Sequence, residues 1–217
     1  MEDRFRDVQR GYDQVAAEYA DRIFGELAHK PFDRALVDRF ADVVRPIGPA
    51  CDVGCGPGHV ARYVHERGLL VVGVDLSSEM VVQARRLSPA ISFCQGSMLA
   101  LPFADDSVGG ISAMYSIIHV PRDLLPVAFA EMRRTLRLGG ALLLAFHLGD
   151  RDVHLEEWWG KSVSIDFYHF DRTEIERHVL DVGFVVQESV ERPPYPDVEH
   201  QSRRAYLLAR KPGVDER

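Results

Sequence analysis

The stretch ACDVGCGPGHVARYV, residues 50–64, decides the fold class. A short apolar segment ends at an acid and a loop punctuated by Gly54, Gly56 and Gly58, and a sequence with helical spacing follows. A glycine-rich loop between a strand and a helix brings backbone N–H groups close to a ligand, most often a phosphate. The stretch therefore predicts a strand–loop–helix unit that binds a nucleotide-like ligand.

The same strand–turn–helix rhythm repeats along the chain. Apolar strand-like runs stand at 69–74, 91–95, 109–117 and 139–147, and segments of helical spacing alternate with them. This alternation predicts an α/β fold with a Rossmann-like, doubly wound, seven-stranded and mostly parallel sheet. No helical segment separates FVVQESVE from RRAYLLAR near the C-terminus, so the last strand is expected to be antiparallel.

The chain is expected to form a single domain with four parts. Residues 1–46 carry two amphipathic helical patterns and form an N-terminal helical cap or lid, and residues 50–149 form the core that binds the cofactor. Residues 150–170 form an insertion beside the pocket. Residues 171–211 contribute a helix and the terminal hairpin.

Composition and charge exclude several functional classes. The 217 residues carry a net charge of −7, which argues against a nucleic-acid partner. Three cysteines make neither a disulfide framework nor a metal site, so no metal is expected. No apolar run reaches the ~20 residues of a membrane span, and the charged N-terminus has no signal peptide. These features predict a cytoplasmic monomer or homodimer that acts on a small molecule.

The loop spacing narrows the choice of ligand. Gly54, Gly56 and Gly58 are one residue closer together than in the dinucleotide fingerprint, which disfavours a nicotinamide-dependent oxidoreductase. His59 and Val60 supply neither the lysine nor the hydroxyl of a phosphate loop.

Two acids at strand ends point to a ribose and a positive charge. Asp52, at the mouth of the loop, would repel a pyrophosphate and attract a cation. Asp75, at the end of the second strand, can accept hydrogen bonds from both hydroxyls of a ribose. S-adenosylmethionine meets these demands, because it combines an adenosine with a sulfonium.

Six segments in order and spacing resemble the class I S-adenosylmethionine-dependent methyltransferases of the bacterial small-molecule type. The resemblance covers residues 8–211 and implies transfer of a methyl group to a small molecule, with S-adenosylhomocysteine as the product. The segments that carry it are YDQVAAEYAD, CDVGCGPG, GVDLSSEMVVQAR, LPFADDSV, SIIHV and EMRRTLRLGG. The expected cofactor-binding residues are Tyr12, Tyr19, Asp52, Gly54, Cys55, Gly56, Gly58, Asp75, Leu76, Met80, Ser97, Met98, Tyr115 and Ser116.

The resemblance also implies individual roles. Leu76 packs on the adenine, which Ser97 and Met98 border, although the family usually has an acid in place of Ser97. Tyr115 and Ser116 approach the sulfonium. The lid tyrosines, Tyr12 and Tyr19, either close over the cofactor or pack in the core.

The methyl acceptor has its own candidate residues. His147, at the end of the fifth strand, is the first candidate for a general base, and His119, after the fourth strand, is the second. Either could instead be a hydrogen-bonded, half-buried histidine. The aromatic insertion is expected to line a pocket for an apolar or aromatic acceptor, or only to pack on itself. Its candidate residues are Trp158, Trp159, Tyr168 and His169.

A non-catalytic S-adenosylmethionine-binding sensor or partner subunit remains an alternative. The residues do not separate it from an enzyme, but the intact loop and the furnished insertion favour catalysis.

Overall fold

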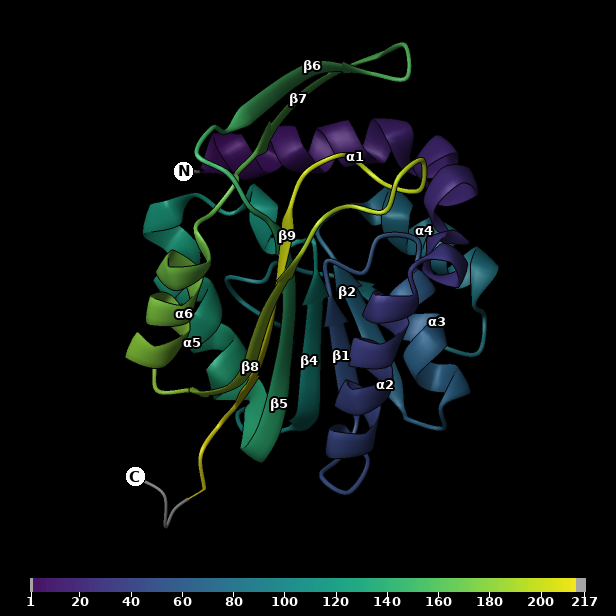
Figure 1. The fold of residues 1–217 in the computed structure, drawn as a ribbon. Coiled ribbons are helices and arrows are strands. Elements are labelled where there is room, and N and C mark those ends of the chain that lie inside the picture. Colours follow the sequence, from purple (N-terminus) through teal and green to yellow (C-terminus); the bar gives the residue numbers. More distant parts are fainter. Residues whose placement is uncertain (1, 214–217) are drawn as a thin grey trace.

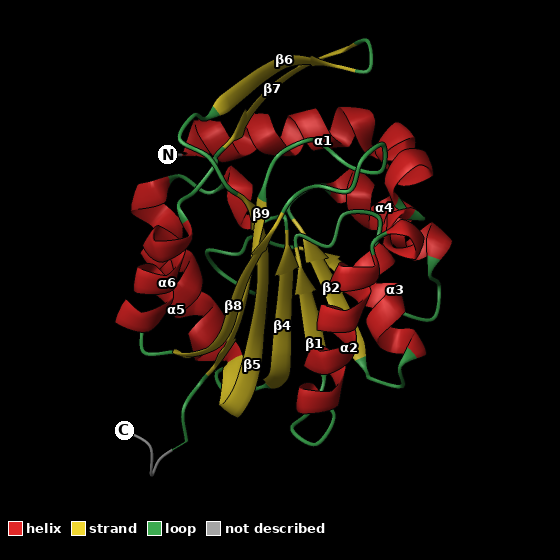
Figure 2. Cartoon of the chain, in the orientation of Figure 1, coloured by secondary structure: helices red, strands yellow, loops and turns green. Residues whose placement is uncertain are grey.

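The computed structural model describes residues 2–213, and its centre is a seven-stranded sheet in the order β3-β2-β1-β4-β5-β9-β8 (Figures 1 and 2). Strands β1 to β5 pair in parallel, whereas β9 is antiparallel to both of its neighbours, β5 and β8. The predicted Rossmann-like sheet with an antiparallel last strand is confirmed. The strands are β1 Ala50–Val53, β2 Val71–Asp75, β3 Ser92–Gln95, β4 Val108–Met114, β5 Leu136–His147, β6 Val153–Trp158, β7 Lys161–Phe167, β8 Val185–Arg192 and β9 Arg204–Arg210.

Helices cover both faces of the sheet (Figure 2). Two of them begin at side-chain caps: the Ser77 hydroxyl accepts a hydrogen bond from the Met80 N–H, and Asp171 accepts one from the Thr173 N–H. The α-helices are α1 Glu2–Ile23, α2 Pro31–Val44, α3 His59–Glu66, α4 Ser78–Leu87, α5 Leu125–Thr135 and α6 Arg172–Asp181. Short 3₁₀ turns are η1 Glu26–His29, η2 Ile117–His119 and η3 Arg122–Leu124.

Strand β5, next to the central strand β4, is buried on both faces. Leu142 and Leu144 join the core beneath α5 and α6, and Ala141 and Leu143 join the core beneath α2, α3 and α4. A parallel strand covered on both sides reads as a continuous apolar run, which explains the segment GGALLLAFH.

The N-terminal cap differs from the expectation for residues 1–46, of which Met1 lies outside the described residues. Helix α1 does cross the carboxyl ends of the strands (Figure 1). Helix α2 packs on a sheet face instead, where Phe40 and Val44 are fully buried.

The segment 150–170 contains the β6–β7 hairpin, which lies on the far side of α1 from the sheet (Figure 1). Val163 and Ile165 of the hairpin pack against Val8 and Val15 of α1. A Cβ on Gly11 would lie 2.5 Å from Cδ1 of Ile165, so the helix and the strand approach closely because residue 11 has no side chain. The hairpin therefore holds α1 over the strand ends.

Candidate functional site

A cleft of about 800 Å³, its mouth included, opens between α1 and the carboxyl ends of β1, β2 and β4. Open α/β sheets bind their ligands at this edge. It brings together twelve residues that the sequence singled out: Tyr12, Tyr19, Gly54, Cys55, Gly56, Asp75, Leu76, Ser97, Met98, Tyr115, Ser116 and His119.

The loop after β1 forms part of the cleft wall. Gly54 and Gly56 have φ angles of +69° and +52°, a backbone region that favours glycine. A Cβ on Gly54 would lie 2.2 Å from Cβ of Ser116, whose hydroxyl donates to the carbonyl oxygen of Val53 over 2.8 Å. The loop and the end of β4 can meet this closely only because residue 54 has no side chain.

Asp75 ends β2 and lines the cleft. Its Oδ2 accepts a hydrogen bond from the Gly56 N–H over 2.7 Å, and its Oδ1 accepts one from the Ser77 N–H over 2.9 Å. Burial raises the pKa of Asp75 to about 6, although these two bonds oppose the shift. Each carboxylate oxygen can accept a second hydrogen bond, so Asp75 can still receive the two hydroxyls of a ribose.

Asp52 does not take the position expected of it. The side chain is buried behind the loop, where Oδ1 accepts from the Ser112 hydroxyl over 2.7 Å and Oδ2 accepts from the Ala61 N–H over 3.1 Å. Burial raises the pKa of Asp52 to about 6. The structure thus corrects the expected contact with a ligand, because Asp52 joins β1 to β4 and α3 and is not part of the cleft wall.

Gly58 and Met80, also expected at the cofactor, lie outside the cleft wall as well. A Cβ on Gly58 would lie 2.8 Å from the Phe93 ring, so this glycine lets α3 begin against β3. Met80 is 1 % exposed and belongs to the core beside α4. Both residues support the elements that carry the cleft.

Aromatic side chains close the cleft on the side of the hairpin. The ring of Tyr12 lies 5.7 Å from that of Tyr19 and 5.5 Å from that of Trp158, between centroids. Trp159, at the hairpin turn, lies under the guanidinium of Arg22 at 4.9 Å. The two tryptophans hold the hairpin on α1 and do not line the cleft, which corrects their expected place in the acceptor pocket.

His119 has both ring nitrogens engaged. Nδ1 lies 2.9 Å from the backbone oxygen of Asp166, which can only accept, so Nδ1 carries the proton. Nε2 is then the acceptor for the Tyr12 hydroxyl, 2.7 Å away. Burial lowers the pKa of His119 to about 4, so the ring is neutral at pH 7 and the unprotonated Nε2 accepts from Tyr12 at the cleft wall.

His147 lies in a different environment. Its Nδ1 is 2.7 Å from the Ser202 hydroxyl, and its ring contacts Tyr115, His169 and His200. Burial, followed by the charge of nearby Arg204, lowers the pKa of His147 to about 3. His147 and His169 are absent from the wall of the main cleft.

Tyr168 is also absent from the wall of the main cleft. It lines a smaller hollow of about 300 Å³ that shares His119 with the main cleft.

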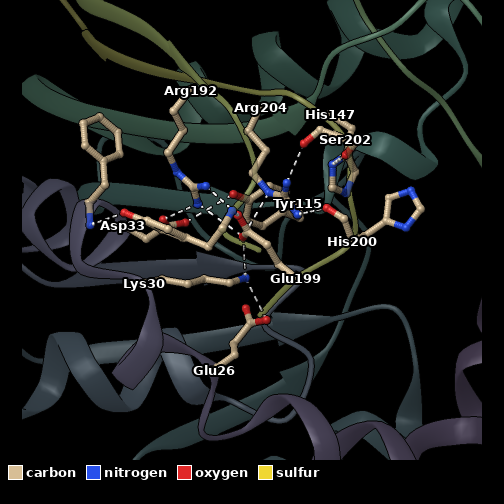
Figure 3. A network of polar contacts seen from close by, with 12 residues as sticks. Glu26, Lys30, Asp33, Tyr115, His147, Arg192, Glu199, His200, Ser202 and Arg204 are labelled. Carbon is tan, nitrogen blue, oxygen red and sulfur yellow. Dashed lines mark hydrogen bonds and ion pairs between the residues drawn. The ribbon is translucent and has the colours of Figure 1, made fainter. Parts of the chain in front are cut away.

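A network of buried polar side chains lies behind Tyr115 (Figure 3). The Tyr115 hydroxyl lies 3.2 Å from Oδ1 of Asp33 and 2.7 Å from the Tyr206 hydroxyl. Tyr115 also has a φ of +55°, unusual for a residue with a side chain. No local pattern in the sequence points to this network, because the partners of Tyr115 are 82 and 91 residues away.

His59 is a cleft residue that the sequence analysis missed as a site. Its Nε2 lies 3.4 Å from Oε1 of Glu26, and its Nδ1 is buried without a hydrogen-bond partner. Burial opposes ionisation of Glu26, but His59 and Lys30 together lower the pKa of Glu26 to about 2. The place of His59 directly after the glycine loop was a signal that could have revealed it.

The described residues contain neither a membrane-spanning helix nor a metal-binding cluster. No helix within residues 2–213 is long and apolar enough to cross a membrane. In the same range, no group of three or more histidine, cysteine, aspartate or glutamate side chains is placed to hold a metal ion.

The sequence matches known methyltransferases. Residues 50–140 match a family model described as a methyltransferase domain. A malonyl-[acyl-carrier protein] O-methyltransferase of Pectobacterium atrosepticum is 37 % identical over 122 residues, which are 50 % of this chain and 47 % of the relative. A demethylmenaquinone methyltransferase of Renibacterium salmoninarum is 30 % identical over 147 residues, 67 % of this chain and 60 % of the relative. The chain spans about half the length of the first of these curated relatives.

Solved structures share the fold. Magnesium protoporphyrin IX methyltransferase of Synechocystis has a TM-score of 0.70 at 17 % identity, covering 96 % of this chain and 97 % of that one. An S-adenosylmethionine-dependent methyltransferase of Methanosarcina mazei has a TM-score of 0.68 at 16 % identity, covering 76 % and 92 %. Together with the sequence matches, they show that the chain belongs to the class I methyltransferase family, whose cofactor is S-adenosylmethionine.

Proposed function

We propose that the protein transfers a methyl group from S-adenosylmethionine to a small-molecule acceptor bound beside His119. The observation that carries the proposal is a single cleft that has a ribose-type carboxylate, Asp75, and a neutral histidine, His119, in its wall. The relatives named O-methyltransferase and demethylmenaquinone methyltransferase support methyl transfer as the reaction.

The residues of the cleft fit the cofactor. Asp75 would accept the ribose hydroxyls, and the loop at Gly54, where a Cβ would collide with Ser116, would lie against the methionine part. Leu76 and Met98 offer apolar surfaces for the adenine. When bound, S-adenosylmethionine supplies an electrophilic methyl group on a sulfonium, a good leaving group.

The chain contributes position, dryness and a proton acceptor. Tyr12 and Tyr19 of α1 exclude water from the cleft, which favours in-line transfer. If the acceptor is a hydroxyl, its proton must leave, and Nε2 of His119 can take it once Tyr12 turns its hydroxyl away. His119 is therefore a better placed base than His147, which is outside the wall of the main cleft.

The test combines turnover with two matched variants. The protein is incubated with S-adenosylmethionine and a metabolite extract, and S-adenosylhomocysteine and methylated metabolites are followed by mass spectrometry. We expect turnover that depends on the protein. For a hydroxyl acceptor, His119→Gln should lower kcat about 100-fold, while His147→Gln leaves it within a few-fold.

Two results would count against these assignments. Tight binding of S-adenosylmethionine without turnover on any fraction of the extract would contradict the enzyme and favour a sensor. Full kcat in His119→Gln with a hydroxyl acceptor would remove His119 as the base and leave the reaction standing.

A further inference from the structure

The connection between β8 and β9 is unusually long for a hairpin. It comprises residues 193–203, eleven residues, whereas hairpin loops usually have two to five. Pro193, Pro196 and Asp197 of this loop are exposed. Glu199, in contrast, points inward from the loop, and its side chain is 2 % exposed (Figure 3).

Three buried cations surround the Glu199 carboxylate. Arg192 donates from Nη1 to Oε1 over 2.5 Å, and the Nε of Arg204 lies 3.1 Å and the Nζ of Lys30 3.4 Å from Oε2. Lys30, Arg192 and Arg204 are 3 %, 8 % and 2 % exposed. Burial opposes ionisation of Glu199. The hydrogen bonds from Arg192 and from the Tyr195 N–H, with the charges of Arg204 and Lys30, nevertheless lower the pKa of Glu199.

Glu199 does not use all the donors of this cluster. The Nε atom of Arg192 is buried and lacks a hydrogen-bond partner. An unpaired buried donor costs stability, and a buried ion cluster is a weak source of stability compared with apolar packing. Glu26 and Asp33 also pair with Lys30 and Arg192, so the donor that the cluster leaves unused is Nε of Arg192.

The cation cluster adjoins the cleft through Tyr115. The Nζ of Lys30 and the Cζ of Arg204 lie 5.4 Å and 5.6 Å from the centroid of the Tyr115 ring. Tyr115 itself lines the cleft. An anionic group held by the cluster would thus be separated from the cleft by one aromatic side chain.

We propose that Lys30, Arg192 and Arg204 form a carboxylate-binding site, which Glu199 fills until a carboxylate of the methyl acceptor displaces it together with the β8–β9 loop. A planar carboxylate matches the guanidinium donors and is the group that the site already holds. The existence of the site does not depend on the proposed function, but naming its ligand as the methyl acceptor does.

The first test removes the internal occupant and supplies a free one. Glu199→Ala deletes a group that acetate reproduces, so sodium acetate should raise the Tm of this variant by several degrees more than sodium chloride at equal ionic strength. Acetamide, a neutral molecule of the same shape, should have no such effect. The Tm of the wild-type protein should respond equally to both salts.

Glu199→Gln provides a second variant if Glu199→Ala does not fold. The amide keeps the size of the side chain but leaves a cation unbalanced, so acetate should again stabilise the variant more than chloride does. Lys30→Met added to either variant should raise the half-saturating acetate concentration about tenfold. If acetate raises the Tm of the variant that folds no more than chloride does, the cluster does not accept a free carboxylate and the proposal is wrong.

The second test uses the wild-type protein and asks whether the methyl acceptor itself carries a carboxylate. The metabolite extract is passed over an anion exchanger before the methyl-transfer assay, and the bound fraction is treated with phosphatase. The activity of the acceptor should be retained on the resin and should survive the phosphatase. Acceptor activity in the flow-through would show that the methyl acceptor is not the ligand of the carboxylate site. Acetate binding without any methyl transfer would support the carboxylate site but contradict the proposed function.

Discussion

Asp75 and Asp52 form a matched pair that tests the site directly. Both are carboxylates at the ends of neighbouring strands, and burial raises the pKa of each to about 6, yet only Asp75 lines the cleft. Asp75→Ala should remove two charge-assisted hydrogen bonds to the ribose, a loss of roughly 2–4 kcal/mol, or at least a 30-fold higher Kd for S-adenosylmethionine.

Stability should distinguish the two variants in the same sense as affinity. Asp75→Ala also leaves the N–H groups of Gly56 and Ser77 without an acceptor, so the free energy of unfolding should fall by about 1–3 kcal/mol. Asp52→Asn can keep both of its bonds, because the amide oxygen accepts from Ala61 and the amide nitrogen can donate to the Ser112 hydroxyl. It should therefore fold normally and bind S-adenosylmethionine within a few-fold of the wild-type protein.

Isothermal titration with S-adenosylmethionine and denaturant unfolding measure the two quantities on the same samples. Equal losses of affinity in Asp75→Ala and Asp52→Asn would refute the assignment, because the affinity would then follow the charge near the loop and not a contact in the cleft. Unchanged affinity in a folded Asp75→Ala variant would refute it as well.

Three further perturbations follow from the geometry. Burial raises the pKa of Asp75 to about 6, and the ribose hydroxyls need the ionised carboxylate, so protons compete with the cofactor. The Kd for S-adenosylmethionine, measured by titration calorimetry, should be constant above pH 6 and rise up to tenfold per pH unit below it. A flat profile down to pH 5 would contradict this. Gly54→Ala places a Cβ 2.2 Å from another side chain, whereas Gly139, with a φ of +79°, has open space around it. In denaturant unfolding, Gly54→Ala should therefore lose at least about 2 kcal/mol more of the free energy of unfolding than Gly139→Ala. Equal losses would mean that backbone strain alone matters. Gly11→Leu should push the hairpin from α1 and speed amide hydrogen exchange in β6 and β7, whereas Gly25→Leu, in open space, should not.

The mostly parallel, doubly wound sheet and the place of Asp75 could be predicted because local and global patterns agree there. The segment 50–64 combines a strand, a glycine loop and a helix in adjacent residues, and Asp75 follows from the rule that ligands bind at carboxyl ends of parallel strands. Neither inference requires knowledge of a side chain's direction.

The sequence did not reveal in which direction the side chain of Asp52 points. All four residues of β1 are buried, so the alternation that normally separates the two faces of a strand carries no information there. The same rule brought His147 to the correct edge of the sheet, but its partner Ser202 is 55 residues away. The pairing of Arg192 with Asp33, 159 residues apart, had no local signature.

The β6–β7 hairpin was expected only as an insertion, without its two strands and turn. Trp159 and Gly160 both have positive φ angles, as in a two-residue turn, and the glycine there was a usable signal. The two adjacent tryptophans suggested a binding pocket more strongly than a turn. Their contacts with α1 arise from tertiary packing, which the short pattern does not contain.

The packing of α1 has a consequence for the order in which the protein matures on the ribosome. The helix is synthesised before its partners, since it packs against α4 and against β7, which ends at Phe167. At the usual rates of translation, its apolar side, including Val8 and Val15, therefore waits on the order of 10 s for its last partner. During that interval the amphipathic helix leaves its apolar side exposed to solvent on the nascent chain.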